Sequence, residues 1–296
     1  MNNYNSIYKL NKTISLSIKR EDYNGNTISG NKLRKLKYNV IEAKRLGINK
    51  IVTFGGAFSN HIHAVSYLSL NYGFEVVGII RGEELIHKID DNSTLSKARE
   101  NGMKFHFVSR EEYKRRNDKA YHDFLKQKIG DFYLIPEGGT NDLAIKGCEE
   151  ILEQADFNYD YVCCPVGTGG TISGIINASQ KHQEIIGFSA LKGDFLKEDI
   201  SKFVTKNNWS INTDYHFGGY AKINAELITF INKFKTKYNI PLDPIYTGKM
   251  LYGINDLIIK GYFKPNSKIL AIHTGGLQGI EGINQKLRQK KLPLLL

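Results

Sequence analysis

The sequence predicts an α/β protein of one large domain or two smaller ones. Short runs rich in β-branched and aromatic residues alternate with longer stretches of helical period along most of the 296 residues. Pairs of glycines follow four of the short runs. Hydrophobic residues make up 41% of the chain and charged residues 24%, as in folded globular proteins. Because strands that alternate with helices form parallel sheets covered on both faces, we expect open, mainly parallel sheets flanked by helices.

Each expected element follows from its local pattern. Seven runs are expected to be strands: residues 51–54, 75–80, 104–108, 132–135, 161–165, 184–189 and 268–273. Six longer stretches are expected to be helices: residues 32–46, 60–72, 94–101, 141–154, 171–179 and 221–238. No repeat, low-complexity tract or linker divides the chain, so composition places no domain boundary.

Charge and cysteine content narrow the class of protein. The chain has 41 basic and 30 acidic residues, a net charge of +11, but only residues 114–116 and 286–291 are densely basic, and both have the pattern of solvated helices. Three cysteines form neither a disulfide framework nor a CxxC metal pair, and no apolar run reaches the ~18 residues of a membrane span. We expect a cytoplasmic protein that binds no metal, membrane or nucleic acid.

The segment VCCPVGTGGTI, residues 162–172, is the first candidate site. A buried strand is expected to run into the loop Gly167-Thr168-Gly169-Gly170, which opens a helix at Thr171. Such a loop aims backbone N–H groups and the positive end of a helix at one point, which suits a phosphate. A nicotinamide or flavin cofactor is disfavoured, because the fingerprint GxGxxG needs glycine where Ile172 stands. A tight turn without a ligand is the alternative.

Lys32, in the segment SGNKLRKL, is the second candidate. It stands at the expected start of a helix, where the positive helix end disfavours the protonated form of its amine. A neutral amine can attack a carbonyl group, so this position suits covalent chemistry. An exposed surface lysine is the alternative.

The segment GGAFSNH, residues 55–61, is the third candidate. Ser59 or Asn60 can cap the following helix, and the first-turn N–H groups there can hold a carboxylate. His61 is either catalytic or a buried, hydrogen-bonded histidine. Two later segments, DPIYTGK at residues 243–249 and HTGG at residues 273–276, place hydroxyl groups beside glycine turns.

Together and in this order, SGNKLRKL, GGAFSNH, PVGTGGT, DPIYTGK and HTGG resemble the 1-aminocyclopropane-1-carboxylate (ACC) deaminase and D-cysteine desulfhydrase family of fold-type II pyridoxal phosphate enzymes. The resemblance extends from about Ser15 to the C-terminus. It implies a tryptophan synthase β-like fold with a large cofactor-binding domain of residues 1–45 and 142–296 and a small domain of residues 46–141. It also implies pyridoxal 5′-phosphate as the cofactor, a small amino acid as the substrate, and a homodimer.

The same resemblance implies roles toward the cofactor. Lys32 corresponds to the lysine that carries the cofactor, and residues 167–171 correspond to its phosphate-binding loop. Asn60 is implied as the partner of the ring hydroxyl. Thr274 is implied at the ring nitrogen, where a neutral hydroxyl does not hold the ring protonated as a carboxylate would, and this favours elimination reactions.

Roles toward the substrate are implied in the same way. Ser59, Asn60 and His61 correspond to residues that receive the α-carboxylate, with the Ser59 hydroxyl near the reacting carbons. Tyr220, in HFGGY, and Tyr246 resemble the two active-site tyrosines of the family.

Two positions depart from the family pattern. The deaminases carry glutamate, in YEGK, where Thr247 stands, whereas YTGK resembles the desulfhydrases, and Phe58 replaces the usual glutamine. We therefore expect D-cysteine desulfhydrase activity that yields pyruvate, sulfide and ammonia. ACC deaminase activity, which yields α-ketobutyrate and ammonia, is the first alternative. There are three further alternatives. The substrate could be another D-amino acid such as D-serine, the protein could be a family member without turnover, or it could be a basic nucleic-acid-binding protein.

Overall fold

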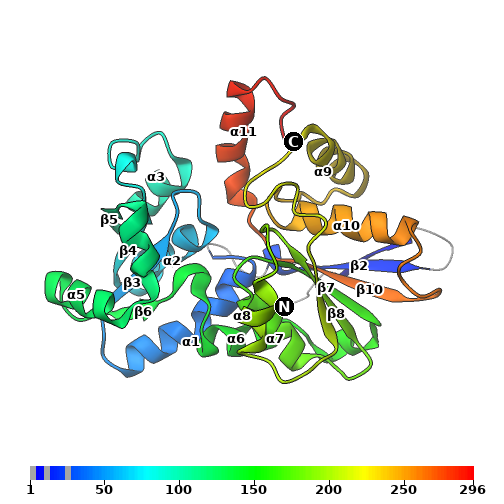
Figure 1. Cartoon of the computed structure of the whole chain (residues 1–296), viewed down its shortest axis with the longest axis horizontal. Helices are drawn as coiled ribbons and strands as arrows, with labels where there is room; N and C mark the ends of the chain where they lie inside the picture. Colours follow the sequence, from blue (N-terminus) through cyan, green and yellow to red (C-terminus); the bar gives the residue numbers. More distant parts are fainter. Residues whose placement is uncertain (1–4, 10–13, 24–27) are drawn as a thin grey trace. The chain divides into compact units, whose positions relative to one another are not determined.

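The computed structural model describes residues 5–9, 14–23 and 28–296. Contacts between Cα atoms divide the chain into two compact units. The large unit comprises Met1–Arg34 and Ile145–Leu296, and the small unit comprises Lys35–Ala144. Each unit contains its own sheet, labelled in Figure 1. The domains predicted at residues 1–45 with 142–296 and at 46–141 stay a prediction.

The small unit is built on a four-stranded parallel sheet in the order β5-β4-β3-β6. Its strands are β3 (Lys50–Gly55), β4 (Glu75–Arg81), β5 (Lys104–Val108) and β6 (Tyr133–Ile135). The helices of this part of the chain are α1 (Asn31–Arg45), whose first turn belongs to the large unit, α2 (Asn60–Tyr72), α3 (Ser93–Glu100), α4 (Arg110–Lys114) and α5 (Lys119–Ile129). Aromatic residues supply much of the core on one face of the sheet, where Phe54 packs against Tyr113 and Tyr121.

The large unit is built on a six-stranded sheet in the order β1-β2-β10-β7-β8-β9, parallel except for the β1–β2 pair. Its strands are β1 (Asn5–Lys9), β2 (Ser15–Arg20), β7 (Tyr161–Val166), β8 (Glu184–Ser189), β9 (Trp209–Asn212) and β10 (Lys268–His273). The remaining helices are α6 (Asp142–Glu149), which starts in the small unit, α7 (Gly170–Ala178), α8 (Leu196–Ser201), α9 (Ala225–Tyr238), α10 (Thr247–Ile259) and α11 (Ile280–Gln289). Short 3-10 segments lie at Glu21–Tyr23, Glu83–Leu85, Arg115–Asn117, Glu137–Gly139, Gln154–Asn158 and Leu277–Gly279.

Helices cover both faces of this larger sheet, and β7 shows how its residues divide between them. Cys163 belongs to the core that α9, α10 and α11 complete, whereas Val162 and Cys164 belong to the core that α7 and α8 complete. This is the alternation expected of a strand buried on both faces. The predicted fold class, mainly parallel sheets flanked by helices, is therefore confirmed.

All seven predicted strands are present. Of the four predicted glycine pairs, Gly55-Gly56 overlaps the end of β3, and the other three follow β6, β7 and β10. Two helix predictions were too long. The helix predicted over 141–154 ends at Glu149, because Glu153 and Asp156 form a capping box for the next segment. The helix predicted over 221–238 begins at Ala225, because the Asn224 side chain accepts the Leu227 N–H and caps it there.

The prediction of a glycine turn at DPIYTGK was wrong, since Thr247, Gly248 and Lys249 form the first turn of α10. Strands β1, β2 and β9 and helices α5, α8 and α10 were not expected. The two basic runs predicted as helices fall on α4 with the following 3-10 turn and on α11, which ends two residues before Lys291.

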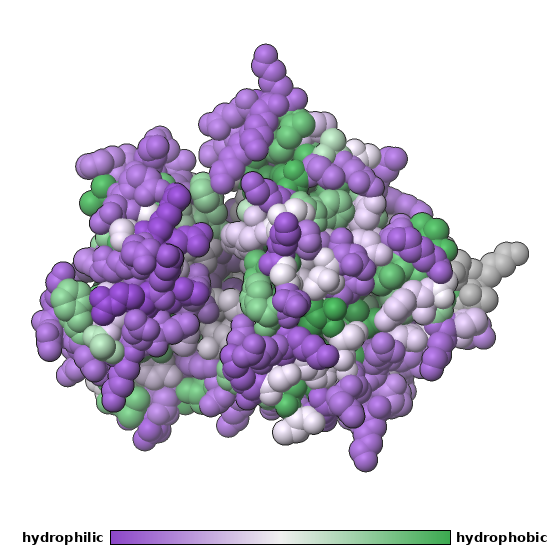
Figure 2. All heavy atoms as spheres, in the orientation of Figure 1, coloured by the Kyte–Doolittle hydropathy of each residue, from purple (hydrophilic) through white to green (hydrophobic). Residues whose placement is uncertain are grey.

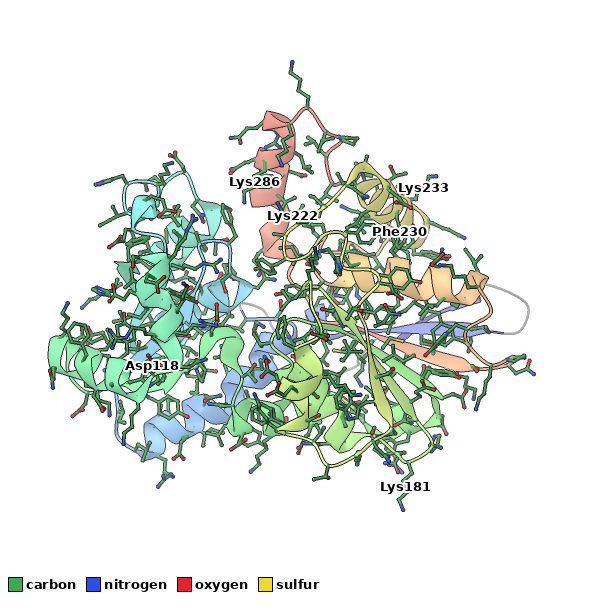
Figure 3. All side chains as sticks on the ribbon, viewed as in Figure 1. Asp118, Lys181, Lys222, Phe230, Lys233 and Lys286 are labelled. Atoms are coloured by element: carbon green, nitrogen blue, oxygen red, sulfur yellow. The ribbon has the colours of Figure 1, made fainter. Side chains whose placement is uncertain are left out.

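The basic charge of the large unit is spread over its surface. Hydrophilic side chains cover most of the face in view in Figure 2. In Figure 3 the labelled lysines of the large unit, Lys181, Lys222, Lys233 and Lys286, come from four separate segments, and all four are exposed. No helix within the described ranges is long and apolar enough to cross a membrane.

Candidate active site

Three of the predicted motifs meet at the start of α1, in the large unit. The Asn31 N–H donates to the carbonyl of Thr274 (3.2 Å), and its side-chain amide donates to the hydroxyl of Thr171 (2.8 Å). Gly30 approaches so closely that a Cβ atom there would lie 2.2 Å from the Thr274 carbonyl oxygen, and its φ is +71°. Lys32, the second residue of α1, is thus next to a residue that contacts both the glycine-rich loop and HTGG.

A charge pair with a buried carboxylate fixes this helix start. The Arg34 guanidinium donates to both carboxylate oxygens of Glu21 (3.0 and 3.1 Å), and Glu21 is fully buried. The backbone carbonyl of Glu21 accepts the N–H of Gly30 at 2.9 Å. Bidentate charged hydrogen bonds are stronger and more directional than neutral ones, so the turn before Lys32 is held from two sides.

The glycine-rich loop has the features of a phosphate site. Gly169 is the N-cap of α7 with a φ of +82°, and no side chain caps the helix, so the first-turn N–H groups are available to an anion. A Cβ atom at Gly169 would lie 2.9 Å from Ile200, which explains why the loop needs glycine there. The donors of this loop therefore fit a phosphate group.

Tyr246 lies next to this loop, and Tyr220 lies next to Tyr246. A Cβ atom at Gly167 would lie 3.1 Å from the Tyr246 hydroxyl, so the phenol of Tyr246 covers that glycine. The rings of Tyr220 and Tyr246 meet edge to face, with their centroids 6.2 Å apart. The large unit thus brings together Lys32, the loop, Thr274 and both tyrosines.

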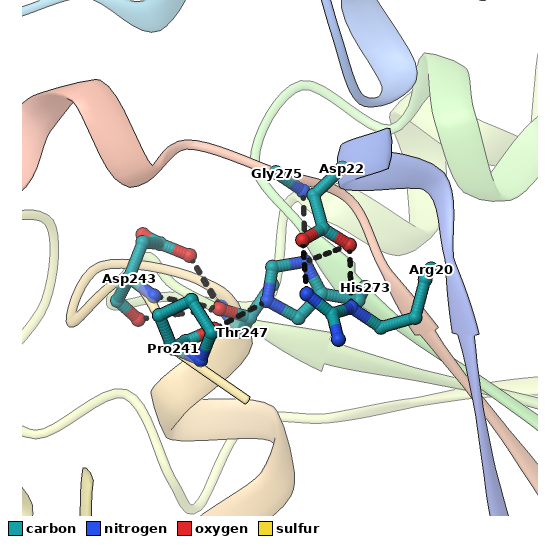
Figure 4. Close-up of polar contacts among 7 residues, drawn as sticks. All are labelled: Arg20, Asp22, Pro241, Asp243, Thr247, His273 and Gly275. Atoms are coloured by element: carbon teal, nitrogen blue, oxygen red, sulfur yellow. Dashed lines mark hydrogen bonds and ion pairs between the residues drawn. The ribbon is translucent and has the colours of Figure 1, made fainter. Parts of the chain in front are cut away.

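Asp243 organises the start of α10, as Figure 4 shows. Its carboxylate accepts the N–H groups of Ile245, Tyr246 and Thr247 (2.8–3.0 Å) and also the hydroxyl proton of Thr247 (2.7 Å). The Thr247 hydroxyl in turn accepts the N–H of Asp243 at 3.0 Å. Because its one proton is donated to Asp243, Thr247 is not available as a donor to a ring nitrogen.

A second buried cluster in Figure 4 supports the turn that carries Thr274. The carbonyl of Pro241 can only accept, so Nε2 of His273 carries a proton and donates it (2.8 Å). Nδ1 of His273 accepts the N–H of Gly275 at 3.3 Å. The carboxylate of Asp22 lies 3.2 Å from the same Nδ1 and binds Arg20 through two hydrogen bonds (2.6 and 2.8 Å). The ends of β2 and β10 are held together by their parallel pairing, in which Arg20 lies opposite His273.

The remaining predicted residues lie in the small unit, at the carboxyl end of β3. Ser59 is the N-cap of α2, and its hydroxyl accepts the N–H groups of His61 and Ile62 (3.2 and 3.3 Å). Asn60 is the first residue of the helix. The predicted cap is therefore present, and Ser59 is the residue that forms it.

His61 is buried, with 2% of its surface exposed. Thr53 donates its hydroxyl proton to the carbonyl of Ile135 (2.8 Å), so its oxygen must accept from Nε2 of His61 (2.7 Å). This geometry favours the buried, hydrogen-bonded histidine that was one of the two interpretations of the sequence. It gives His61 a part in holding the SNH segment against β3.

Three residues with structural roles in the site were not singled out from the sequence. Asn31 joins three motifs, Asp243 organises α10, and Lys249 is buried at the same helix start. All three stand inside quoted motifs, so the local signal was present. The partners of Asn31 and Lys249, however, lie far away along the chain, whereas those of Asp243 are its neighbours Ile245, Tyr246 and Thr247.

These features are those of one class of protein, the fold-type II pyridoxal phosphate enzymes. They are the uncapped helix start that fits a phosphate, the lysine segment bonded to it, and the nearby threonine turn. The family model described as "Pyridoxal-phosphate dependent enzyme" matches residues 4–275, and the chain belongs to this family. Its cofactor is therefore pyridoxal phosphate, and the nucleic-acid-binding alternative loses its support.

The individual proteins that this chain resembles belong to the same family. The chain is 32% identical to the "Bifunctional D-cysteine desulfhydrase/1-aminocyclopropane-1-carboxylate deaminase, mitochondrial" of Arabidopsis thaliana, over 90% of this chain and 73% of the relative. It is 27% identical to the 1-aminocyclopropane-1-carboxylate deaminase of Methylobacterium nodulans, over 93% and 90%. A crystal structure described as an ACC deaminase homologue superposes with a TM-score of 0.79 at 27% identity, covering 93% of this chain and 88% of the other. The resemblance to the ACC deaminase and D-cysteine desulfhydrase family is confirmed.

Proposed function

We propose that the protein is a D-cysteine desulfhydrase, which converts D-cysteine and water into pyruvate, hydrogen sulfide and ammonia. The observation that carries this proposal is the environment of Thr247. In the deaminases of the family a glutamate is implied at this position, whereas here a fully buried threonine is bonded to Asp243. Position 247 therefore supplies no carboxylate to a ring nitrogen.

Bound pyridoxal phosphate supplies an aldehyde for the substrate amine and a ring that withdraws electrons from the α-carbon, more strongly when its nitrogen is protonated. Opening the cyclopropane ring of ACC breaks a carbon–carbon bond and benefits most from that protonation. Loss of a thiolate from D-cysteine breaks a weaker bond to a good leaving group. A site without a carboxylate at position 247 therefore favours the thiol substrate.

The residues of this chain are proposed to share the work as follows. Lys32 provides the amine that carries the cofactor, and residues 167–171 hold its phosphate through backbone N–H groups. Thr274 and Asn60 orient the ring. These assignments extend the contacts of Asn31 and the uncapped start of α7 to the bound cofactor.

A second set of residues is proposed to act on the substrate. Ser59 and Asn60, at the start of α2, receive the α-carboxylate, and His61 fixes their segment through Thr53. The phenols of Tyr220 and Tyr246 move protons at the α-carbon and at the leaving sulfur. We further propose a cytoplasmic homodimer, on the family resemblance. Sedimentation equilibrium tests the dimer.

The test is a comparison of substrates at equal concentration. Release of pyruvate and sulfide from D-cysteine is measured against release of α-ketobutyrate from ACC, with L-cysteine and D-serine alongside. We expect D-cysteine to react fastest. Faster α-ketobutyrate release would replace this proposal with ACC deaminase, the activity that the name of the Methylobacterium relative favours. No product from any of the four would indicate another amino acid or a protein without turnover.

Covalent labelling tests the proposed site separately. The purified protein should absorb near ~410–420 nm, and borohydride should remove this band and leave the label on the peptide that contains Lys32. The Lys32→Ala variant should lack the stable band. A label on a different lysine would refute the assignment of the site while leaving the family membership intact.

A further inference from the structure

Lys249 is a buried cation to which neither the family resemblance nor the proposed mechanism gives a role. Its side chain is 1% exposed, and its ammonium group donates to the carbonyls of His216 and Gly219, both at 2.8 Å. Burial lowers the pKa of Lys249 to about 8, although the nearby carboxylate of Asp243 acts in the opposite direction. A buried charge is costly unless it has hydrogen-bond partners. The two carbonyls are those partners, so the part of the chain that they belong to is the part that Lys249 holds in place.

The two carbonyls belong to consecutive tight turns. The N–H of Gly219 donates back to His216 (3.0 Å), and the N–H of Lys222 donates back to Gly219 (3.1 Å). The ammonium of Lys249 therefore bonds to the closing carbonyl of each turn. One side chain thus fixes the whole segment of residues 216–222.

This segment has a backbone that requires such support. Phe217, Gly218, Gly219 and Ala221 have φ values of 52°, 91°, 111° and 55°. Phenylalanine and alanine rarely adopt positive φ, and such residues persist where surrounding contacts impose the conformation. Inside the segment, the Gly218 N–H donates to Nδ1 of His216 (2.9 Å), while the contacts from Lys249 come from another element.

The segment carries Tyr220, in the second turn. Its ring, 42% exposed, meets the ring of Tyr246 edge to face. Tyr246 directly precedes α10, and Lys249 lies in the first turn of that helix. The start of α10 therefore positions both tyrosines. Tyr246 is attached to it directly, and Tyr220 is held through the ammonium of Lys249.

We propose that Lys249 is a positioning residue that fixes the turns of residues 216–222 and so holds the phenol of Tyr220 beside Tyr246 for proton transfer. The inference rests on the proposed function, because it takes the two phenols as proton-transfer groups. Lys249 acts through the segment, and its own ammonium remains bonded to the two carbonyls.

A double-mutant cycle tests the inference. The Lys249→Met and Tyr220→Phe variants and the double variant are compared on the substrate with the highest activity in the panel. Lys249→Met should lower kcat by about tenfold or more, because small displacements of a catalytic group cost that much, while the cofactor absorption band is retained. The double variant should have a kcat within about twofold of Tyr220→Phe alone, since Lys249 acts through Tyr220. If kcat in the double variant is instead lowered by the product of the two single-variant losses, the inference is overturned.

The matched control is Lys222→Met, the same substitution at an exposed lysine of the same segment (Figure 3). Its kcat should stay within about twofold of that of the wild type, because its ammonium supports neither turn. Lys249→Arg keeps a cation and its donors, and should recover part of the activity lost in Lys249→Met. A loss in Lys222→Met equal to that in Lys249→Met would show that the segment responds to any lost charge and would contradict the role of Lys249.

Hydrogen exchange separates this inference from the proposed function. The amides of Gly219 and Lys222 close the two turns, and their exchange should be about tenfold faster in Lys249→Met and unchanged in Lys222→Met. Unchanged exchange in Lys249→Met, or in Lys249→Gln if the methionine variant fails to fold, overturns the inference even when the wild-type enzyme is active. Inactivity of the wild type on every substrate, together with faster exchange in the variant, overturns the proposed function alone.

Discussion

The hydroxyl of Thr247 and the carboxylate of Asp243 form a closed pair of hydrogen bonds at the start of α10. Thr247 donates to Asp243 at 2.7 Å and accepts the backbone N–H of Asp243 at 3.0 Å, with both residues 1% exposed or less. A residue that the sequence marks as a substrate determinant thus also stabilises the helix that follows Tyr246. Its substitution should therefore change stability, separately from the proposed effect on substrate choice.

Removal of the Thr247 hydroxyl should therefore destabilise the fold. We expect Thr247→Val to lower the free energy of unfolding by about 1–3 kcal/mol, because the buried N–H and carboxylate of Asp243 lose a partner. Thr247→Ser keeps the hydroxyl and is the matched control. Thr247→Glu should lose more than Thr247→Val, because it buries a second carboxylate against the first. Urea unfolding measures all three variants, and a Thr247→Val variant as stable as the wild type would contradict the expectation.

Gly30 should not tolerate a side chain. Its φ is +71°, and a Cβ atom would lie 2.2 Å from the Thr274 carbonyl oxygen. Gly47 has nearly the same φ, +68°, but nothing lies within 4 Å of the corresponding Cβ position. Gly47→Ala should cost about 1 kcal/mol from backbone conformation alone, and Gly30→Ala should cost several kcal/mol.

Unfolding measurements on the two alanine variants isolate the steric term, since the backbone term is common to both. Titration with pyridoxal phosphate adds a second readout. Gly30→Ala should bind the cofactor more weakly than Gly47→Ala, because the clash displaces the contact between the lysine segment and Thr274. Equal losses in both variants would argue that this close approach is unimportant.

The buried pair of Lys19 and Asp156 should be far more sensitive to substitution than an exposed pair. Both side chains are 1% exposed and directly bonded. Asp156→Asn leaves the ammonium of Lys19 buried without this counter-charge, and should cost about 3–5 kcal/mol. Asp199→Asn removes the partner of Lys202 in a pair that is about half exposed, and should cost far less, because water and salt screen an exposed pair. Denaturant unfolding at pH 7 compares them, and similar losses would refute the distinction.

His63 should make the fold less stable in acid. Burial, with a smaller contribution from the charge of Lys97, lowers the pKa of His63 from 6.5 to about 4. Between these two pH values the unfolded chain binds a proton at His63 and the folded chain does not. The contribution of this residue to the free energy of unfolding therefore decreases as the pH falls from about 6.5 to about 4.

The variant His63→Gln removes this titration. Between pH 7 and pH 4.5 the wild type should lose about 2 kcal/mol more stability than the variant, as measured by urea unfolding. Parallel losses in both proteins would assign the acid sensitivity to other groups.

Seven strands could be predicted because their runs are apolar or rich in β-branched and aromatic residues, and glycine pairs mark the ends of four of them. Strand β2 was missed because its buried residues include Lys19 and Arg20, which read as surface charges. Their counter-charges are Asp156, far along the chain, and Asp22, which is itself buried. Strand β9 is four residues long and lies at the sheet edge, so it carries too little pattern to be recognised.

The candidate site was predictable where its chemistry is local. The glycines of the phosphate loop, the cap of α2 and the position of Lys32 at a helix start all follow from neighbouring residues. The roles of Asn31 and Lys249 were not predictable, because Asn31 meets Thr171 and Lys249 meets His216 across long stretches of chain. In the sequence each of these two residues has the pattern of an ordinary polar residue, because its partner becomes a neighbour only in the folded chain.

The place of β10 in the large sheet has a consequence for the order of events during synthesis. This strand lies between β2 and β7, so until residues 268–273 leave the ribosome the sheet exists as two separate pieces. One piece leads to the lysine segment and the other to the phosphate loop, whereas the small unit is a continuous stretch of chain that emerges long before. We therefore expect the proposed site to assemble only near the end of translation, and a nascent chain arrested before β10 contains every residue from Lys32 to Tyr246 without that site assembled.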